Sequence, residues 1–570
     1  MKNVKKMLAV LLALVTVCAV MPIAASAKTY TDGDLSLRYE IMSGEVYIVD
    51  GKDNKGAVVI PSEIDGYKVT TISNNAFLEC TEMTSLTLPD TVDTINASAF
   101  QGCTALTELV LPDSYIAMAL RCFAYCTSLE SVVVGEGVVS LAPDMFKGCT
   151  SLTDVTLPST LDSVATGAFQ NCVALEEVSI PAGVTIIRTN AFNGCTSLKN
   201  ITGAENLITL GDYAFRDCAS FEGFDTSVEL KYVHIGAFQN CASLKSVRFE
   251  DSEDTVIYDY AFSGCTSFTE VEIPENATLK SGEGLFMGCT SLENVTLPKT
   301  ITELPAKFFE GCSSLVSFEV PSHITAIGER VFKDCTSLEA VELGSNITSI
   351  GEYAYSGCTS LTSVTVPENV TRLEEGIFSN CINLENIILH EGITYYGEKI
   401  IDGTAYYNDG AHRENGLLYL DNVLIDAEYS GSEAVTVEIR SGTEYIASKA
   451  FANVYKIESL IIPIEMKGIG DGIISKGTPV GEVVYLGTSY RWNNIKIGED
   501  NINWTVDMYN SVHGDVDGDG ELRANDALTL RKFLASNADI MEIDYIAADV
   551  DCDGMLTAKD QLRLRRMLSE

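Results

Sequence analysis

The feature that most constrains the fold of this 570-residue chain is a cysteine that recurs at almost constant spacing. Consecutive members are 23 residues apart eleven times and 24 residues apart twice. The fourteen members are Cys80, Cys103, Cys126, Cys149, Cys172, Cys195, Cys218, Cys241, Cys265, Cys289, Cys312, Cys335, Cys358 and Cys381. A unit this short cannot bury its own apolar face, so it must stack on its neighbours. The period therefore predicts a solenoid of successive turns around one shared core.

Each unit carries further apolar residues at fixed distances from its cysteine. An aromatic residue stands three positions before every one of the fourteen cysteines, and Leu, Phe or Met stands three positions after. A short alternating segment follows, as in Leu152 to Leu157, and predicts a strand that buries every second side chain. The A-F-x-x-C-x-S-L form, seen in Ala191 to Leu198, resembles the BspA-like leucine-rich repeats of bacterial surface and secreted proteins. The resemblance spans roughly residues 57–497 and implies an α/β repeat solenoid with about fourteen regular turns plus irregular ones.

Three interpretations of the cysteine positions remain open: free thiols, disulfides between stacked turns, and a metal site. Apolar neighbours and the lack of CxxC or CxxH pairs favour free, buried thiols. Val454 occupies the cysteine position of a later unit, and valine can neither form a disulfide nor bind a metal. Cys122 and Cys552 lie outside the series, and the sequence assigns them no role.

A second internal repeat occupies the end of the chain, from Asp515 to Glu570, where Asp515 to Leu522 and Asp549 to Leu556 are near-copies. Oxygen ligands recur at positions one, three and five, glycine at six and an acid at twelve. This is the spacing of a twelve-residue calcium loop, because Ca²⁺ prefers six to eight oxygen ligands. The expected ligands of two Ca²⁺ ions are Asp515, Asp517, Asp519, Glu521 and Asp526 in the first loop, and Asp549, Asp551, Asp553, Met555 and Asp560 in the second.

Each calcium loop leads into a predicted helix, Ala527 to Leu534 and Gln561 to Leu568. A loop and its following helix, used twice, resemble a type I dockerin. The resemblance implies a small all-α calcium-binding domain that docks on a cohesin module of a scaffold protein. The implied cohesin-binding residues are Ala524, Asn525, Arg531, Lys532, Ala558, Lys559, Arg565 and Arg566. The Ser-Thr pair of the best-known dockerins is missing here, so the cohesin class and the binding orientation stay open.

The chain begins with a predicted secretory signal peptide, Met1 to Ala27, which has three lysines, an apolar run and an Ala-Ser-Ala cleavage site. A retained membrane anchor is the alternative. The remaining predicted parts are an N-terminal cap with a first irregular turn (28–72), the regular solenoid (73–400), irregular repeats with a C-terminal cap (401–504), a short linker (505–513) and the dockerin (514–570).

The charge of the chain bears on its partners and its location. Loss of the signal peptide changes the formal charge from −42 to −45, because the peptide contains three lysines and no acid. Such a charge disfavours nucleic acid and anionic membrane surfaces. No other segment is apolar and long enough to cross a bilayer. We therefore expect a secreted, extracellular protein, held at a cell surface only through a scaffold.

The sequence predicts a binding protein instead of an enzyme. Its five histidines form no metal-ligand spacing, and no GxSxG, HExxH or phosphate loop occurs. The alternative is a dockerin-bearing glycoside hydrolase, which would need two facing carboxylates in a cleft.

Two sets of residues are candidates for the unknown protein or glycan ligand of the solenoid. Glu270, Glu272, Glu319 and Glu342 form the densest acidic group on the outward sheet face, where ordinary solvated acids are the alternative. Tyr406, Tyr407 and His412 lie in a long loop, where packing of the cap is the alternative.

Overall fold

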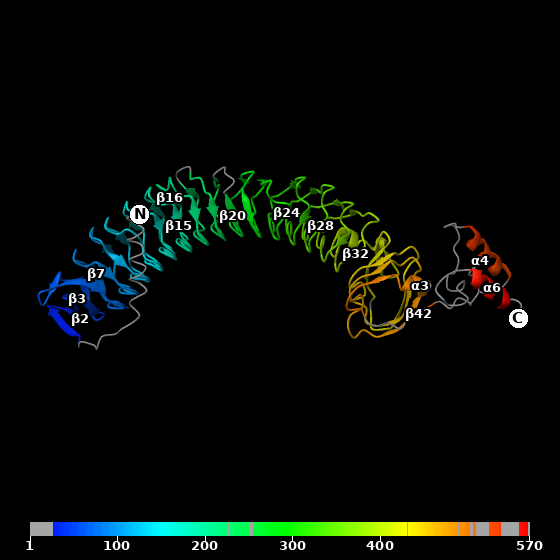
Figure 1. Ribbon diagram of the computed structural model, residues 1–570, viewed down its shortest axis with the longest axis horizontal. Helices are drawn as coiled ribbons and strands as arrows, with labels where there is room; N and C mark the ends of the chain where they lie inside the picture. Colours follow the sequence, from blue (N-terminus) through cyan, green and yellow to red (C-terminus); the bar gives the residue numbers. More distant parts are fainter. Residues whose placement is uncertain are drawn as a thin grey trace. The chain divides into compact units, whose positions relative to one another are not determined.

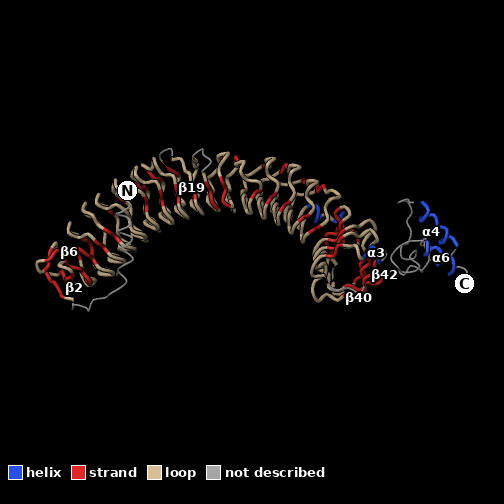
Figure 2. Tube along the Cα trace, in the orientation of Figure 1, coloured by secondary structure: helices blue, strands red, loops and turns tan. Residues whose placement is uncertain are grey.

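The computed structural model describes residues 27–224, 228–249, 255–429, 431–487, 489–501, 506–508, 524–536 and 558–567. The chain divides into two units, Met1–Thr300 and Ile301–Glu570. Within each unit, short strands joined by tight turns coil into a β-solenoid (Figures 1 and 2). The described residues form about 19 such turns. The predicted repeat solenoid is thereby confirmed.

The first unit contains five sheets. The first is formed by β1 (Lys28–Asp32), β2 (Leu35–Met42), β3 (Glu45–Asp50), β5 (Glu63–Ile64), β6 (Tyr67–Ile72), β8 (Thr94–Ile95) and β10 (Ala117–Met118). The second is formed by β4 (Gly56–Val59), β7 (Met83–Thr87), β9 (Glu108–Val110), β11 (Ser131–Val133) and β12 (Asp154–Thr156). The third is formed by β13 (Ser163–Val164), β15 (Ile186–Ile187), β17 (Thr209–Leu210), β19 (Tyr232–Val233), β20 (Val256–Tyr258) and β22 (Thr278–Lys280). The last two are formed by β14 (Glu177–Ser179), β16 (Asn200–Thr202) and β18 (Gly223–Phe224), and by β21 (Glu270–Glu272) and β23 (Asn294–Thr296). The count covers the described residues of this unit.

The second unit begins with four small sheets and continues with two larger ones. The small sheets are β24 (Glu303–Leu304), β26 (Ala326–Ile327) and β28 (Ser349–Ile350); β25 (Ser317–Glu319) and β27 (Ala340–Glu342); β29 (Ser363–Thr365) and β31 (Asn386–Ile388); and β30 (Arg372–Leu373) and β32 (Tyr395–Tyr396). The larger sheets are β33 (Arg413–Glu414), β34 (Leu417–Leu420), β35 (Val423–Ala427), β37 (Tyr445–Ile446), β39 (Gly468–Ile469) and β41 (Lys496–Ile497); and β36 (Val435–Glu438), β38 (Ile457–Ile462), β40 (Val480–Tyr485) and β42 (Val506–Met508).

Most regular turns contribute a strand to each of two parallel sheets. The predicted strands pair with a step of one repeat, as Ser131 does with Asp154, and the middle residue of β12 is buried between two exposed ones. A second strand of two residues, which the sequence analysis missed, lies on the other side of the turn, as Ser163–Val164 does. Tight turns complete the circuit in place of the helix of an α/β solenoid. In the described part of the solenoid, helices are short: α2 (Ala405–Asn408), the 3-10 helix η1 (Gly410–His412) and α3 (Ser489–Trp492).

The residue before each of the fourteen repeat cysteines has a left-handed backbone. Its φ is positive in every turn, for example +73° at Gly102 and +61° at Asn171. Twelve of these fourteen residues are Gly, Asn or Asp, which tolerate this conformation better than other residues. The left-handed residue ends the turn after the aromatic position and directs the next cysteine into the core.

The repeated aromatic residues form stacked series inside each unit. In the first unit, neighbouring rings have centroids 5.0 Å apart at Phe77 and Phe100, and 6.1 Å apart at Phe123 and Phe146. In the second unit, Phe332 and Tyr355 lie 5.3 Å apart. These rings are 0–1% exposed, so they hold successive turns together by area burial and ring stacking.

The cysteines lie beside the rings as free, buried thiols. Twelve of the fourteen thiols donate to the backbone carbonyl of the aromatic residue one turn earlier, as Cys195 Sγ does to Phe169 O at 3.0 Å and Cys358 Sγ to Phe332 O at 3.1 Å. In the first turn, Cys80 Sγ donates to Asn54 O at 3.1 Å instead. Burial raises the pKa of Cys195 to about 12. The repeat therefore uses cysteine as a small apolar residue that also donates a hydrogen bond between turns. Cys122 is buried too, whereas Cys552 lies outside the described residues.

Replacing Tyr355 by Phe is expected to raise the free energy of unfolding by about 1–2 kcal/mol. Tyr355 is 1% exposed, and its buried hydroxyl has no hydrogen-bond partner in the part of the chain that the structure describes. Phenylalanine occupies this position in the neighbouring turns, so the ring has a suitable site without the hydroxyl. Thermal and urea unfolding measure the change. The matched control is Tyr353→Phe, which removes a hydrogen bond to Glu375 and should not stabilise the protein.

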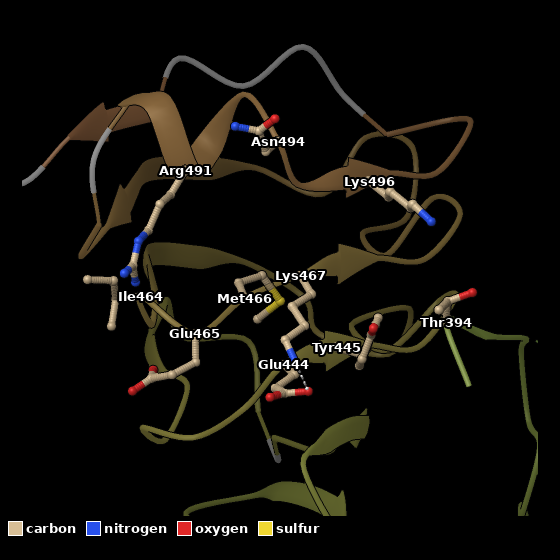
Figure 3. Close-up of a pocket in the computed structure, with 10 residues that line it drawn as sticks. All are labelled: Thr394, Glu444, Tyr445, Ile464, Glu465, Met466, Lys467, Arg491, Asn494 and Lys496. Atoms are coloured by element: carbon tan, nitrogen blue, oxygen red, sulfur yellow. Dashed lines mark ion pairs between the residues drawn. The ribbon is translucent and has the colours of Figure 1, made fainter. Parts of the chain in front are cut away.

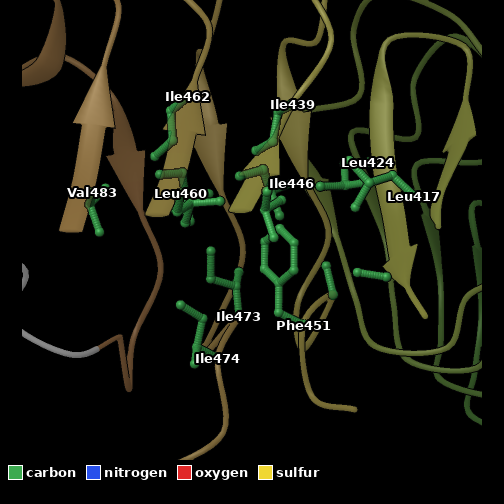
Figure 4. Packing of buried hydrophobic residues seen from close by; sticks show 14 of the residues in the cluster. Leu417, Leu424, Ile439, Ile446, Phe451, Leu460, Ile462, Ile473, Ile474 and Val483 are labelled. Carbon is green, nitrogen blue, oxygen red and sulfur yellow. The ribbon is translucent and has the colours of Figure 1, made fainter. Parts of the chain in front are cut away.

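The end of the solenoid has its own apolar core (Figure 4). The strands β34 and β35 form an antiparallel hairpin at the start of this region. Leu424, Ile446 and Leu460, from three different strands, are at most 1% exposed and belong to one cluster. The cluster closes the stack of turns with branched aliphatic side chains and has Val454 where a regular turn has cysteine.

Candidate partner-binding sites

Two helices near the C-terminus carry the first candidate site. They are α4 (Ala524–Ser536) and α6 (Ala558–Met567), and they pack against each other. Both begin three residues earlier than predicted, at the tenth position of the acidic pattern. Since the first acidic pattern begins at Asp515 and the second at Asp549, Ala524 and Ala558 are equivalent positions. The structure thus repeats one local arrangement twice.

The packing of these helices follows the internal repeat. Leu530 and Leu564 occupy equivalent positions and are fully buried. Leu528 and Leu562 are also equivalent, yet they are 45% and 56% exposed. Exposed leucines at matching positions of two short helices are the clearest apolar feature of this part of the chain. The sequence analysis did not single them out, although comparing the two repeats would have paired them.

The exposed leucines share a helix face with basic residues. Arg531 and Lys532 follow Leu528 by three and four positions, the spacing of neighbours on a helix surface. Both are exposed, as is Arg565, which follows Leu562 by three positions. Ala558 and Lys559 are exposed in the first turn of α6. Among the other residues implied as cohesin contacts, Ala524 and Asn525 begin α4 and Arg566 lies in α6, but their side chains are outside the described set.

The calcium-loop residues fall largely outside the described ranges. Asp515, Asp517, Asp519 and Glu521 are not described, and neither are Asp549, Asp551, Asp553 and Met555. Asp526 and Asp560 are each the third residue of their helix.

The donor set fits Ca²⁺, because it offers hard carboxylate oxygens and the helix start places the twelfth-position acid in the first helical turn after the loop. When bound, Ca²⁺ would neutralise the crowded carboxylates of each loop. Asp515, Asp517, Asp519 and Asp526 would hold one ion, and their counterparts in the second repeat the other.

The outward face of the strands is the second candidate site. Glu270 and Glu272 are exposed at the ends of β21, and they lie opposite Asn294 and Thr296 of β23. In the second unit, Glu319 is exposed in β25 and pairs in register with Glu342 of β27. The structure thus places these acids as two pairs, one in each unit.

The loop with Tyr406, Tyr407 and His412 is folded onto the solenoid. The Tyr406 ring stacks on His412 with centroids 3.7 Å apart, and its hydroxyl donates to Tyr419 O at 2.9 Å. The Tyr407 hydroxyl donates to Asp426 Oδ2 at 2.9 Å, and burial, aided by the negative charge of Asp426, raises the pKa of Tyr407 to about 12. These polar atoms thus hold the loop on β34 and β35.

Comparison with known proteins gives the class of the two regions. A family model for the BspA type leucine-rich repeat region matches residues 70–198, 163–282, 279–408 and 426–489. A model for the dockerin type I domain matches residues 513–569. No curated protein matches the chain.

Solved structures similar to the chain include leucine-rich-repeat proteins. One from Bacteroides ovatus is 23% identical, with 66% of this chain and 92% of that chain covered and a TM-score of 0.42. A leucine-rich cell surface protein from Faecalibacterium prausnitzii is 26% identical, with 64% and 95% covered and a TM-score of 0.37. The pneumococcal vaccine antigen PcpA is 12% identical, with 86% and 100% covered and a TM-score of 0.32.

The repeat unit and the paired helices define a leucine-rich-repeat solenoid followed by a small docking module. The chain belongs to the BspA type leucine-rich-repeat family and carries a C-terminal type I dockerin domain. Type I dockerin domains bind calcium, and their partner is a cohesin. None of the helices in the described ranges has the length and apolar character needed to span a membrane.

Proposed function

We propose that this protein is a secreted, non-catalytic binding or adhesion protein that a calcium-dependent dockerin–cohesin interaction attaches to a cellulosome-like scaffold. The observation that carries the proposal is the repeated helix face of α4 and α6. Each copy presents an exposed leucine beside basic side chains and follows an acidic loop with calcium-ligand spacing. An apolar anchor with a charged surround is typical of a protein-binding surface.

Calcium would act on this surface by shaping it. A domain this small has little core of its own, and Leu530 and Leu564 are its fully buried side chains in the described residues. Ligand binding to the folded form alone stabilises that form by mass action. Two Ca²⁺ ions are therefore expected to stabilise the packing of α4 on α6 and, with it, the cohesin-binding surface.

The solenoid would supply the binding function of the rest of the chain. Glu270 and Glu272 in the first unit, with Glu319 and Glu342 in the second, suit a protein with a basic surface. The alternative of a hydrolase needs two carboxylates that are available to a substrate. In a groove at the end of the solenoid, Glu444 is paired with Lys467 at 2.7 Å and Asp471 accepts from Tyr395 at 2.8 Å. Both acids thus already have partners within the chain.

A pull-down from the host's culture medium tests the proposal. With Ca²⁺ present, the full chain is expected to retain one scaffold protein, and EDTA is expected to release it completely. Replacing Asp515 and Asp549 by Ala together should mimic EDTA, with at least about a hundredfold loss of scaffold affinity, because even outer-shell changes cost metal sites 10–100-fold.

The matched control replaces Glu270 and Glu272 by Ala, which removes the same number of acids from the sheet face. This variant should retain the scaffold in a calcium-dependent manner. Scaffold binding that survives both EDTA and the Asp515→Ala/Asp549→Ala change would overturn the calcium mechanism.

A further inference from the structure

A groove in the second unit has no role in the dockerin interaction. It consists of two adjoining cavities of about 660 and 430 Å³, which share Thr394, Tyr445 and Lys496 as lining residues (Figure 3). The groove lies where the small sheet of β32 meets the larger sheet of β37, β39 and β41. Ser448 N still donates to Tyr396 O at 2.9 Å across this junction, but the inserted strands β33 to β35 interrupt the regular stacking of turns.

The floor of the groove is the outer face of three strands. Tyr445, Gly468 and Lys496 lie side by side in register on β37, β39 and β41. A Cβ added at Gly468 would lie 2.9 Å from a carbon of the Tyr445 ring, so the glycine makes room for that ring. Tyr396 packs against Tyr445 with ring centroids 5.4 Å apart. Tyr445 is 9% exposed and Tyr396 4%, so the floor offers a small exposed part of the Tyr445 ring next to a lysine.

Basic and acidic side chains both line the groove, in a chain whose formal charge is −42. The basic ones are Arg372, Lys467, Arg491 and Lys496, and the acidic ones are Glu444, Glu465, Asp471 and Glu499. Lys467 pairs with Glu444 at 2.7 Å, as Figure 3 shows beside Tyr445. Arg372 lies 3.7 Å from the centroid of the Tyr395 ring and pairs with Glu374 at 2.7 Å. Lys496 is exposed and forms no ion pair with any residue that the structure describes. Since Lys496 lines both cavities, its ammonium group is available to an anionic group of a ligand in either one.

The same groove contains an acceptor that lacks a donor. The Oε2 atom of Glu465 is buried and has no hydrogen-bond partner among the described residues, whereas its Oε1 accepts from Ser441 Oγ at 3.1 Å. A buried carboxylate oxygen is stabilised by a hydrogen-bond donor. A ligand that fits this cavity would therefore carry hydroxyl or amide donors as well as an anionic group.

We propose that the groove binds a short, sparsely acidic oligosaccharide. A uronic acid carboxylate would pair with Lys496, a sugar ring would lie against Tyr445, and a hydroxyl would donate to Glu465. Extended peptides commonly bind by adding a strand to a free sheet edge, but this floor presents side chains of a sheet face. A densely charged polyanion is disfavoured because the net negative charge of the chain repels it at long range.

Calorimetry on the full chain tests the proposal with a matched pair of ligands. One is a short xylo-oligosaccharide that carries a single glucuronic acid, and the other is the same oligosaccharide without it. The acidic ligand is expected to bind at least about tenfold more tightly, the size of one charge-assisted hydrogen bond. Lys496→Glu should remove this preference, while Lys476→Glu, at an 85% exposed lysine outside the groove, should keep it. Circular dichroism checks that both variants are folded.

The outcomes separate this proposal from the dockerin interaction. Binding of the acidic sugar should be unchanged in EDTA, because the groove uses no calcium ligand. Equal affinity for both sugars, or a preference that persists in Lys496→Glu, would overturn the proposal. Tighter binding of a short acidic peptide than of the acidic sugar would assign the groove to a protein partner and overturn it as well.

Discussion

Raising the pH from 8 to about 10 is expected to unfold the solenoid in a steep transition. Burial raises the pKa of the thiols of Cys122, Cys195 and Cys289 to about 12 in the folded protein, against 9.0 for an unburied thiol. The folded state therefore keeps its thiol protons when the unfolded state loses them. Stability is fully present below pH 9 and falls as the pH rises from 9 toward 12.

The size of the effect follows from the number of thiols. At pH 10 each such group favours the unfolded state by about 1.4 kcal/mol, so these three alone contribute about 4 kcal/mol. Burial also raises the pKa of Cys172, Cys218, Cys241 and Cys265, one turn after another. A typical domain is stable by only about 5–15 kcal/mol, so the sum is expected to exceed the stability of the solenoid.

Far-UV circular dichroism between pH 7 and 11, under reducing conditions, measures this transition. The control is a variant in which Cys172, Cys195, Cys218 and Cys241 are all replaced by Val. Valine is chosen because Val454 occupies the cysteine position of a later unit. This variant loses four thiol-to-carbonyl hydrogen bonds, so its stability at pH 7 should fall. Its loss of stability between pH 8 and 10 should nevertheless be smaller by about 5 kcal/mol. An unchanged pH dependence would show that thiol ionisation does not drive the transition.

Replacing both Leu528 and Leu562 by Asp is expected to abolish scaffold binding while calcium uptake persists. Each substitution removes an exposed apolar side chain that we assign to the cohesin contact and places a negative charge beside the basic residues of the same face. Truncation of an interface anchor alone costs about 2 kcal/mol or more. Because one of the two leucines contacts the cohesin at a time, the double variant should lose at least about thirtyfold in affinity. Surface plasmon resonance against the scaffold measures the affinity, and calorimetry measures calcium uptake.

The two single variants distinguish binding orientations. If either repeat can face the cohesin, the intact copy substitutes for the altered one. Each single variant should then bind the scaffold with about half the affinity of the unaltered protein. If one helix face always makes the contact, one single variant should match the double variant and the other should match the unaltered protein. The control is Leu530→Asp, which affects a fully buried residue and should disrupt calcium-dependent folding as well. Full scaffold affinity in the Leu528→Asp/Leu562→Asp protein would refute the assignment of this surface.

The interior of the regular turns could be predicted from the sequence because its apolar residues recur with a single period. Phe192, Cys195 and Leu198 recur in register, and all three are fully buried. The left-handed residue before each cysteine was harder to recognise, since Glu79 and Tyr125 occupy that position beside the Gly, Asn and Asp of other turns. The second strand of each turn was missed because two residues are too few to show an alternation.

The groove could not be predicted, because its residues meet only after the chain has left the repeat. Tyr396 and Tyr445 belong to consecutive units of the stack but are separated in the sequence by the β34–β35 hairpin and a folded loop. Sequence reasoning chose the tyrosines of that loop as ligand candidates. Their hydroxyls donate hydrogen bonds to Tyr419 and Asp426, whereas Tyr395 and Tyr396 line the groove.

The hydrogen bond from the cysteine of one regular turn to the aromatic residue of the turn before it has a consequence for how such a chain can change in length. Every regular turn offers the same donor on one side and the same acceptor on the other, as in Cys218 to Phe192 and Cys241 to Phe215. Duplication or loss of a complete unit by recombination therefore leaves every junction chemically unaltered. A deletion of a few residues would shift the register of the turn that contains it and break its hydrogen bonds to both neighbours. Related chains are therefore expected to differ in length by whole repeat units.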